Sequence, residues 1–103
     1  MVPATIEDGS VTVAITTNGN SPTLSKFLRE KFEASLAGAG NVAEAMAEAR
    51  ETVAGMALPQ PRRRAILRQL IESEELWLAA VDSPARTAEV CEEQLARFIQ
   101  DHM

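Results

Sequence analysis

The sequence has few of the residues that build metal centres and nucleophilic active sites. Its 103 residues include one cysteine, Cys91, and one histidine, His102. One Cys and one His cannot complete a tetrahedral zinc site, and His102 lies next to the chain end, where the backbone often frays. Cys91 has no partner for an internal disulfide and is expected to be a small buried residue. The sequence therefore predicts no metal ligands and no catalytic residue.

Several motifs and segments are also missing. There is no G-x-G-x-x-G dinucleotide fingerprint, no Walker-type phosphate loop and no nucleophile elbow. No run of about 18 apolar residues occurs, and the N-terminus lacks the basic start of a secretory signal. We therefore expect a cytoplasmic protein with no membrane contact and no dinucleotide site of its own.

Positive charge is scarce as well. The formal net charge is -5, and the only dense basic cluster is Arg62-Arg63-Arg64. Proteins that bind nucleic acid usually present a basic face, so this balance predicts no nucleic-acid partner. Hydrophobic residues make up 46% of the chain, enough for a modest core that a partner subunit or a neighbouring domain could extend.

The first part of the chain has the pattern of two short strands. Residues 2–6 read as an extended edge segment, residues 7–10 as a turn, and residues 11–16 as a strand rich in β-branched side chains. The two segments could pair as a hairpin, although a lone pair of strands is marginal in water.

Helical periodicity follows. Ser21-Pro22 is a favoured helix start, Gly38 and Gly40 are expected to end that helix, and Asn41 is expected to open the next. Further helices are expected after Pro61, after Ser73 and after Pro84. The prediction is a mainly α (α+β) fold: a hairpin-like pair of strands followed by about five helices. We expect a dimerisation and substrate-contact region at 1–37 and a helical domain at 38–103.

The junction of the second strand and the first helix is the most informative segment. A strand that leads directly into a capped helix leaves backbone N–H groups at the positive end of the helix dipole. Polar side chains, a glycine and two basic residues surround this point, so the segment could bind an anion. The residues are Thr16, Thr17, Asn18, Gly19, Asn20, Ser21, Lys26 and Arg29. The alternative is a capped helix after a solvated turn.

The first third of the chain resembles the siroheme synthase family, in V-P-A-T-I at residues 2–6 and in VTVAITTNGNSPTLSKFLREKF at residues 11–32. That family has a V/M-P-x-x-I segment, a second strand, a Ser-Ser-Gly-Gly-Thr-Ser-Pro loop and a helix with an R-E-K-L-E ending. Here Thr16 and Thr17 keep the hydroxyls, whereas Asn18 and Asn20 depart from the pattern. Farther along, Arg62-Arg63-Arg64 resembles the family's basic helix start.

The resemblance implies an enzyme that oxidises precorrin-2 to sirohydrochlorin with NAD+, and in some members also inserts Fe2+. It implies a homodimer, and an upstream Rossmann domain that carries the NAD+ loop and the acid–base aspartate. The chain alone is then expected to be inactive. The eight residues at the strand–helix junction would contact the tetrapyrrole, and Arg62-Arg63-Arg64 would either contact another carboxylate or form a solvated helix start.

Two alternatives stay open at this point. The chain could be a helical homodimerisation or protein-interaction module with no activity, or a small helical regulator unrelated to tetrapyrroles. The sequence also does not distinguish a dehydrogenase from a combined dehydrogenase and ferrochelatase, or reveal whether a methyltransferase domain follows.

Overall fold

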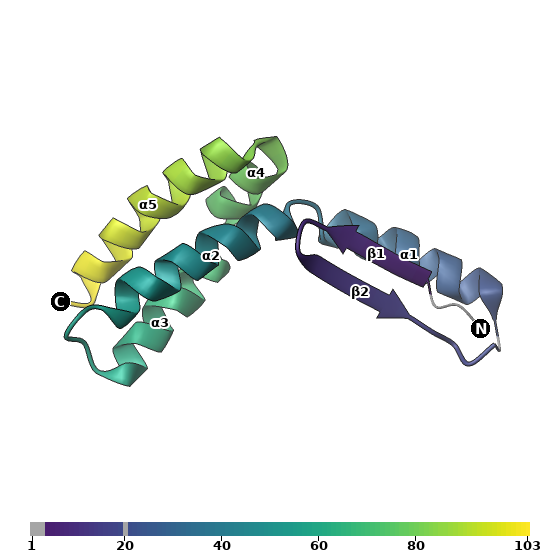
Figure 1. Ribbon diagram of the computed structural model, residues 1–103, viewed down its shortest axis with the longest axis horizontal. Coiled ribbons are helices and arrows are strands. Elements are labelled where there is room, and N and C mark those ends of the chain that lie inside the picture. The colour runs from purple at the N-terminus through teal and green to yellow at the C-terminus, as the bar shows by residue number, and fades with distance from the viewer. Residues whose placement is uncertain (1–3, 20) are drawn as a thin grey trace.

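A computed structural model of the chain describes residues 4–19 and 21–103, which form two strands and five helices (Figure 1). The strands are β1 (Ala4–Asp8) and β2 (Val11–Ile15), and the first helix is α1 (Pro22–Ser35). The other helices are α2 (Ala39–Ala54), α3 (Gln60–Ile71), α4 (Glu74–Asp82) and α5 (Pro84–Asp101). The predicted α+β class is confirmed. Val2 and Pro3, assigned to the first extended segment, lie outside the described residues.

β1 and β2 pair as the expected antiparallel hairpin, from Ala4 opposite Ile15 to Asp8 opposite Val11. The chain reverses at Gly9, whose positive φ of 58° suits a tight turn. Alternate side chains face α1, and among them Ile6 is buried, with 6% of its surface exposed. Within the described residues, α1 therefore covers one face of the hairpin.

Helix α1 begins as the sequence predicts. The side chain of Ser21 accepts a hydrogen bond from the Leu24 N–H, and Pro22 occupies the first turn. None of its residues is buried, and Leu24, Phe27 and Phe32 keep 45–51% of their surface exposed. Helix α1 thus presents an apolar face that the described part of the chain covers only in part.

The expected boundary between the first two helices is wrong. Helix α1 ends at Ser35, before Gly38 and Gly40, and α2 begins at Ala39 rather than at Asn41. Gly38 adopts a φ of 87° at the N-cap and has no side chain that could cap the helix. Asn41 lies inside α2, where its Nδ2 donates to the Ala80 carbonyl at the end of α4.

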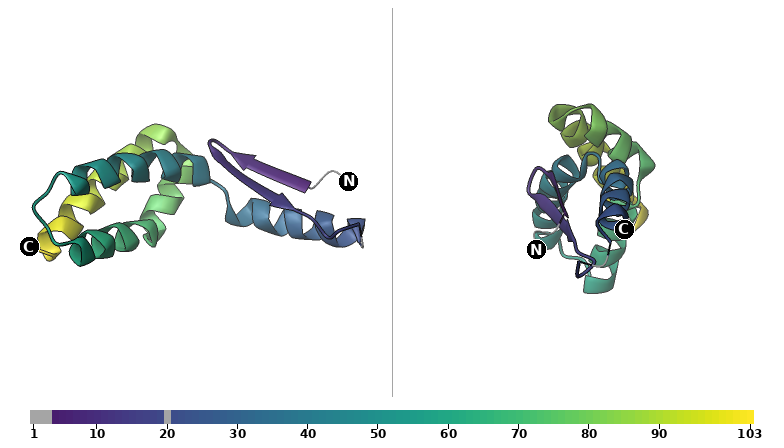
Figure 2. Two further views of the ribbon diagram at one scale, coloured as in Figure 1. Left: turned by 60° about the horizontal axis from the view of Figure 1, so that its bottom comes forward. Right: turned by 90° about the vertical axis from the view of Figure 1, so that its right-hand side faces the viewer.

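Helices α2 to α5 pack around one hydrophobic core, in which α5 contacts α2, α3 and α4. The most deeply buried side chains include Val53, Ile66, Leu70 and Leu76. Figures 1 and 2 show this helical part lying end to end with the hairpin and α1, in a molecule that measures 52 × 28 × 18 Å. The loop between β2 and α1 therefore lies at the end of the molecule away from the helical core.

Candidate functional site

The loop between β2 and α1 turns through two residues with positive φ. Asn18 has a φ of 56° and Gly19 a φ of 80°, a conformation that Asn and Gly tolerate better than other residues. Asn18 and Gly19 are exposed, and Asn20 lies outside the described residues. Asn18 stands where the resemblance would place a glycine, and its left-handed backbone keeps the turn that a glycine would allow.

Two of the predicted donors hold the loop together. Thr17 Oγ1 accepts from the Ser21 N–H at 3.4 Å and lies 3.3 Å from the Ser21 carbonyl oxygen and 3.1 Å from Ser25 Oγ. Ser21 Oγ accepts from the Leu24 N–H at 3.1 Å. These contacts fix the start of α1, so Thr17 and Ser21 form the frame of the site. Their contact with a substrate stays a prediction.

The groups that face solvent are fewer. Thr16 Oγ1 accepts from the Asn18 N–H at 3.3 Å, and its own hydrogen can point outward. In the first turn of α1, Pro22 has no N–H and Ser25 N–H donates to the Ser21 carbonyl, which leaves the Thr23 N–H without a partner among the described residues. Thr23 is a donor that the sequence analysis missed. The sequence contains the signal for it: in a helix that starts with Ser-Pro, the proline has no N–H, and the residue after it carries the first free amide of the helix.

The two basic residues of α1 differ. Arg29 Nε pairs with Glu33 Oε1 at 3.1 Å, one turn farther from the loop, so its charge is directed away from the helix start. Lys26 is exposed and forms no ion pair within the described residues. Lys26 is therefore the basic side chain better able to serve an anion at the loop.

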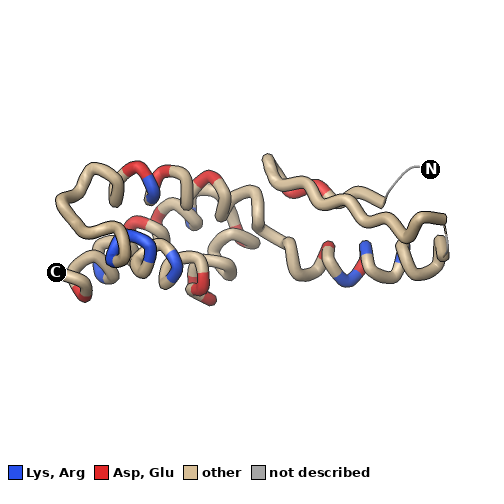
Figure 3. The backbone as a smooth tube through the Cα atoms, turned by 90° about the horizontal axis from the view of Figure 1, so that it is seen from below, with Lys and Arg blue, Asp and Glu red and all other residues tan. Residues whose placement is uncertain are grey.

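The arginine cluster lies elsewhere. Figure 3 shows basic residues on α3, at the end of the molecule where the C-terminus lies, and a separate set on α1. Arg62 Nη1 donates to the His102 carbonyl at 3.0 Å, which fixes it beside the end of α5. Because the molecule is 52 Å long, one chain does not bring Arg62-Arg63-Arg64 to a ligand held at the β2–α1 loop.

A glycine-containing stretch, Gly38-Ala39-Gly40-Asn41-Val42-Ala43, has the spacing of a relaxed dinucleotide fingerprint. It follows α1 instead of a strand, and the Asp8 carboxylate accepts the N–H groups of Gly38 and Gly40 at 3.1 and 2.7 Å. A carboxylate occupies the position that a pyrophosphate would need, and the two described strands are antiparallel. The described residues therefore do not fit NAD+.

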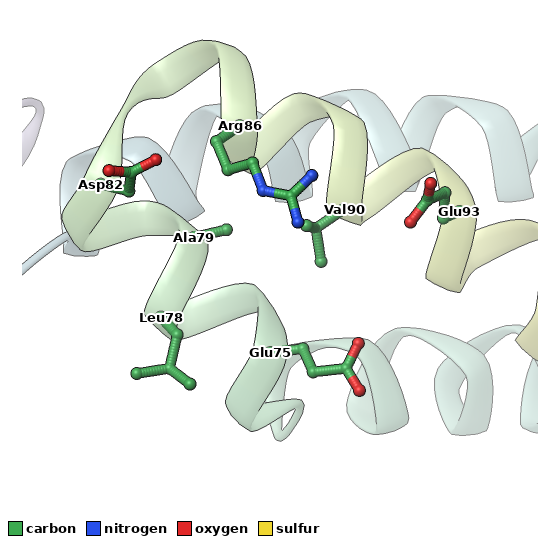
Figure 4. A pocket seen from close by; sticks show the side chains of 7 residues that line it. All are labelled: Glu75, Leu78, Ala79, Asp82, Arg86, Val90 and Glu93. Atoms are coloured by element: carbon green, nitrogen blue, oxygen red, sulfur yellow. The ribbon is translucent and has the colours of Figure 1, made fainter.

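A hollow of about 370 Å³ lies between α4 and α5 (Figure 4). Three carboxylates, Glu75, Asp82 and Glu93, line it together with Arg86, whose Nη1 pairs with Glu89 at 3.3 Å. Its excess of negative charge would repel a polycarboxylate, so the hollow is a poor site for a tetrapyrrole.

Cys91 is buried, as the sequence predicts, and its Sγ donates to the Ala45 carbonyl at 3.7 Å. Burial, with the negative charges of Glu48 and Glu92, raises the pKa of this thiol. No group of three or more metal-ligating side chains is found in residues 4–19 and 21–103. Across the same residues, no helix combines the length and apolar character needed to span a membrane.

The segment that contains the β2–α1 loop is similar to a known protein family. Residues 8–35 match the family model described as "Sirohaem biosynthesis protein central", and these residues span the β2–α1 loop. The resemblance to the siroheme synthase family is confirmed.

A solved structure, "SirC, precorrin-2 dehydrogenase", shares the fold with a TM-score of 0.65 over 94% of this chain, at 19% identity. The chain spans 46% of that structure's length. No curated protein matches the sequence. The resemblance to the siroheme synthase family thus rests on residues 8–35. The similarity to the solved structure shows that the helical part shares the fold of that structure as well.

Proposed function

We propose that this chain is the dimerisation and tetrapyrrole-contacting portion of a siroheme biosynthesis enzyme that oxidises precorrin-2 to sirohydrochlorin in the cytoplasm. The observation that carries the proposal is the family match over residues 8–35, which includes the capped helix start of α1. In the proposed division, residues 1–37 contact substrate and partner, and residues 38–103 form the helical domain.

An upstream Rossmann domain would hold NAD+ and supply the acid–base group, because the described residues offer no suitable phosphate cradle. This chain would hold and orient the substrate, which predicts no oxidation by the chain alone. Fe2+ would be a second substrate if the whole enzyme is also a chelatase.

Substrate contact is supported by chemistry at the β2–α1 loop. The exposed Thr16, Asn18 and Gly19 lie beside the N-terminus of a 14-residue helix, whose first turn carries no acidic residue. Such a helix end favours a carboxylate, and Lys26 lies one turn in. A tetrapyrrole with several carboxylates would bind here through one edge.

Sirohydrochlorin titration, followed by the absorbance of the tetrapyrrole, tests this contact. We expect the wild-type chain to bind, and Asn18→Asp with Lys26→Glu to weaken binding at least about tenfold, since charge-assisted hydrogen bonds are lost and two negative charges are added. Lys31→Glu makes the same lysine-to-glutamate change farther along α1, with Asn18 left in place, and should bind nearly as well. No binding by the wild type, or equal loss in both variants, would contradict the proposal.

Homodimerisation is supported by the exposed apolar face of α1. Leu24, Phe27 and Phe32 are 45%, 51% and 45% exposed, and the hairpin beside them has two unpaired edges. A two-stranded sheet gains stability when a further layer or strand joins it. A second copy of this chain would bury that face.

Sedimentation velocity over a wide range of concentrations tests the dimer. We expect the wild type to dimerise and Phe27→Glu to be monomeric, because a charge would be placed in the apolar contact. The matched control is Leu78→Glu on α4, a 65% exposed side chain that lies in the helical part. A wild type that stays monomeric at all concentrations would contradict this part of the proposal.

A further inference from the structure

A second hollow, of about 320 Å³, lies between α2 and α3. Its polar lining comes from Arg50 of α2 and from the first two turns of α3, and its apolar lining from both helices. The residues are Arg50, Val53, Ala54, Gln60, Arg63, Arg64 and Leu67. Three arginines thus converge on one hollow in a chain whose net charge is -5.

None of the three arginines that line the hollow has an acidic partner within the described residues, a property that they share with Arg62 and Arg97. Arg29, Arg68 and Arg86 each pair with a glutamate on their own helix. Arg50, Arg63 and Arg64 form no ion pair in the part of the chain that the structure describes. Like charges held together without a counter-ion repel one another, so an anion placed among them would be attracted strongly.

Arg63, which lines the hollow, has one hydrogen-bond donor without a partner in the described structure. Its Nη2 donates to Gln60 Oε1 at 3.2 Å, but its Nε is buried and has no acceptor among the described residues. A buried donor without an acceptor costs free energy, and a rotation of the guanidinium toward an anion in the hollow would recover it.

Helix α3 adds to the positive potential. It has 12 residues, its N-cap is Pro59, which supplies no side-chain acceptor, and its first turn contains no acidic residue. The positive end of the helix dipole therefore has no acidic side chain in its own first turn, and Gln60, the first residue of α3, lines the hollow.

We propose that this hollow, hereafter the α2–α3 pocket, binds a small organic anion with a carboxylate or phosphate group. Guanidinium groups recognise both groups through paired N–H donors, and Val53, Ala54 and Leu67 would pack on the carbon skeleton. The volume of about 320 Å³ lies at the small end of the range for ligand pockets, which favours a metabolite of few atoms.

Titration of the 15N-labelled chain with inorganic phosphate and, separately, with succinate tests the pocket and distinguishes the two anion classes. We expect saturable shifts of the amide signals of Gln60, Arg63 and Arg64 with at least one probe. Arg50→Gln combined with Arg64→Gln should weaken that binding at least about tenfold, because two charged donors are removed. Both side chains are exposed, so the variant is expected to fold.

The matched control is Arg68→Gln, on the same helix but 77% exposed in its side chain, paired with Glu72 and outside the pocket. Its affinity should be unchanged. No saturable shift with either probe, or equal weakening in the control, would overturn the proposal. The pocket lies at the other end of the molecule from the β2–α1 loop, so its failure and that of the sirohydrochlorin test are separate results.

Discussion

The carboxylate of Asp8 accepts a hydrogen bond of 2.7 Å from the backbone N–H of Gly40, 32 residues farther along the chain. Its second oxygen accepts from the Gly38 N–H at 3.1 Å. One side chain at the end of β1 thereby caps α2, whose own N-cap residue has no side chain to do so. This cap joins the hairpin to the helical part.

Replacement of Asp8 should weaken the fold. Asp8→Asn removes the negative charge and one of the two acceptors at the start of α2, and should lower the free energy of unfolding by about 1–2 kcal/mol. Urea denaturation measures the change. Glu7→Gln is the control, because Glu7 is an exposed neighbour on β1. Equal stability of the two variants would show that the cap contributes nothing.

Gly40 should not tolerate a side chain. A Cβ at this position would lie 2.6 Å from the Asp8 carbonyl oxygen and 2.7 Å from the Gly9 Cα, both backbone atoms. Gly40→Ala should therefore destabilise the protein by roughly 1–3 kcal/mol, although alanine favours helices. In Gly55→Ala the nearest atom to the new Cβ would be 3.6 Å away, and stability should be nearly unchanged. Thermal unfolding of both variants compares them, and a Gly40→Ala variant as stable as the wild type would contradict the crowding.

Gln94 should be needed in the helical core, where only 4% of its surface is exposed. Ser73 Oγ donates to Gln94 Oε1, and Gln94 Nε2 donates to Glu75 Oε2 at 2.9 Å. Gln94→Leu would remove both bonds and should cost about 1–3 kcal/mol of unfolding free energy. Gln100→Leu changes an exposed glutamine of the same helix. Denaturation midpoints that shift equally would argue against the network.

The Cys91 thiol should react slowly with a thiol reagent at neutral pH. Its pKa is raised by burial, Glu48 and Glu92, so little thiolate forms. The pKa of this thiol is higher in the native than in the unfolded protein, so its contribution to the free energy of unfolding is fully present below about pH 8.5. That contribution is lost as the pH rises toward the native pKa. Cys91→Ala should lack this component of the pH dependence. Rapid modification of the native protein would contradict the prediction.

Local sequence patterns predicted most of the secondary structure. The alternation of β-branched residues predicted β2, and Ser21-Pro22 predicted the start of α1. Ser73 and Ser83 likewise cap α4 and α5. Each of these signals acts over at most a few residues, so the sequence contains all of the information that they need.

The candidate sites depended more on tertiary contacts. The polar composition of the β2–α1 loop was evident from the sequence, but the division between the framing Thr17 and the exposed Asn18 followed from the path of the backbone. Arg50 was not a candidate at all, because it is 13 residues from Arg63 and only the packing of α2 on α3 brings them to one pocket.

The sequence by itself determined the strand–loop–helix segment, its family resemblance and the helical remainder. Tertiary structure decided where α2 begins, since its capping group comes from Asp8 on another element. It also decided that the two basic regions lie at opposite ends of the molecule (Figure 3). The physical reason is that a helix cap from the preceding residue and a hydrophobic period depend only on nearby residues. A cap from a distant strand, and a pocket lined by arginines of two helices, depend on which elements pack together.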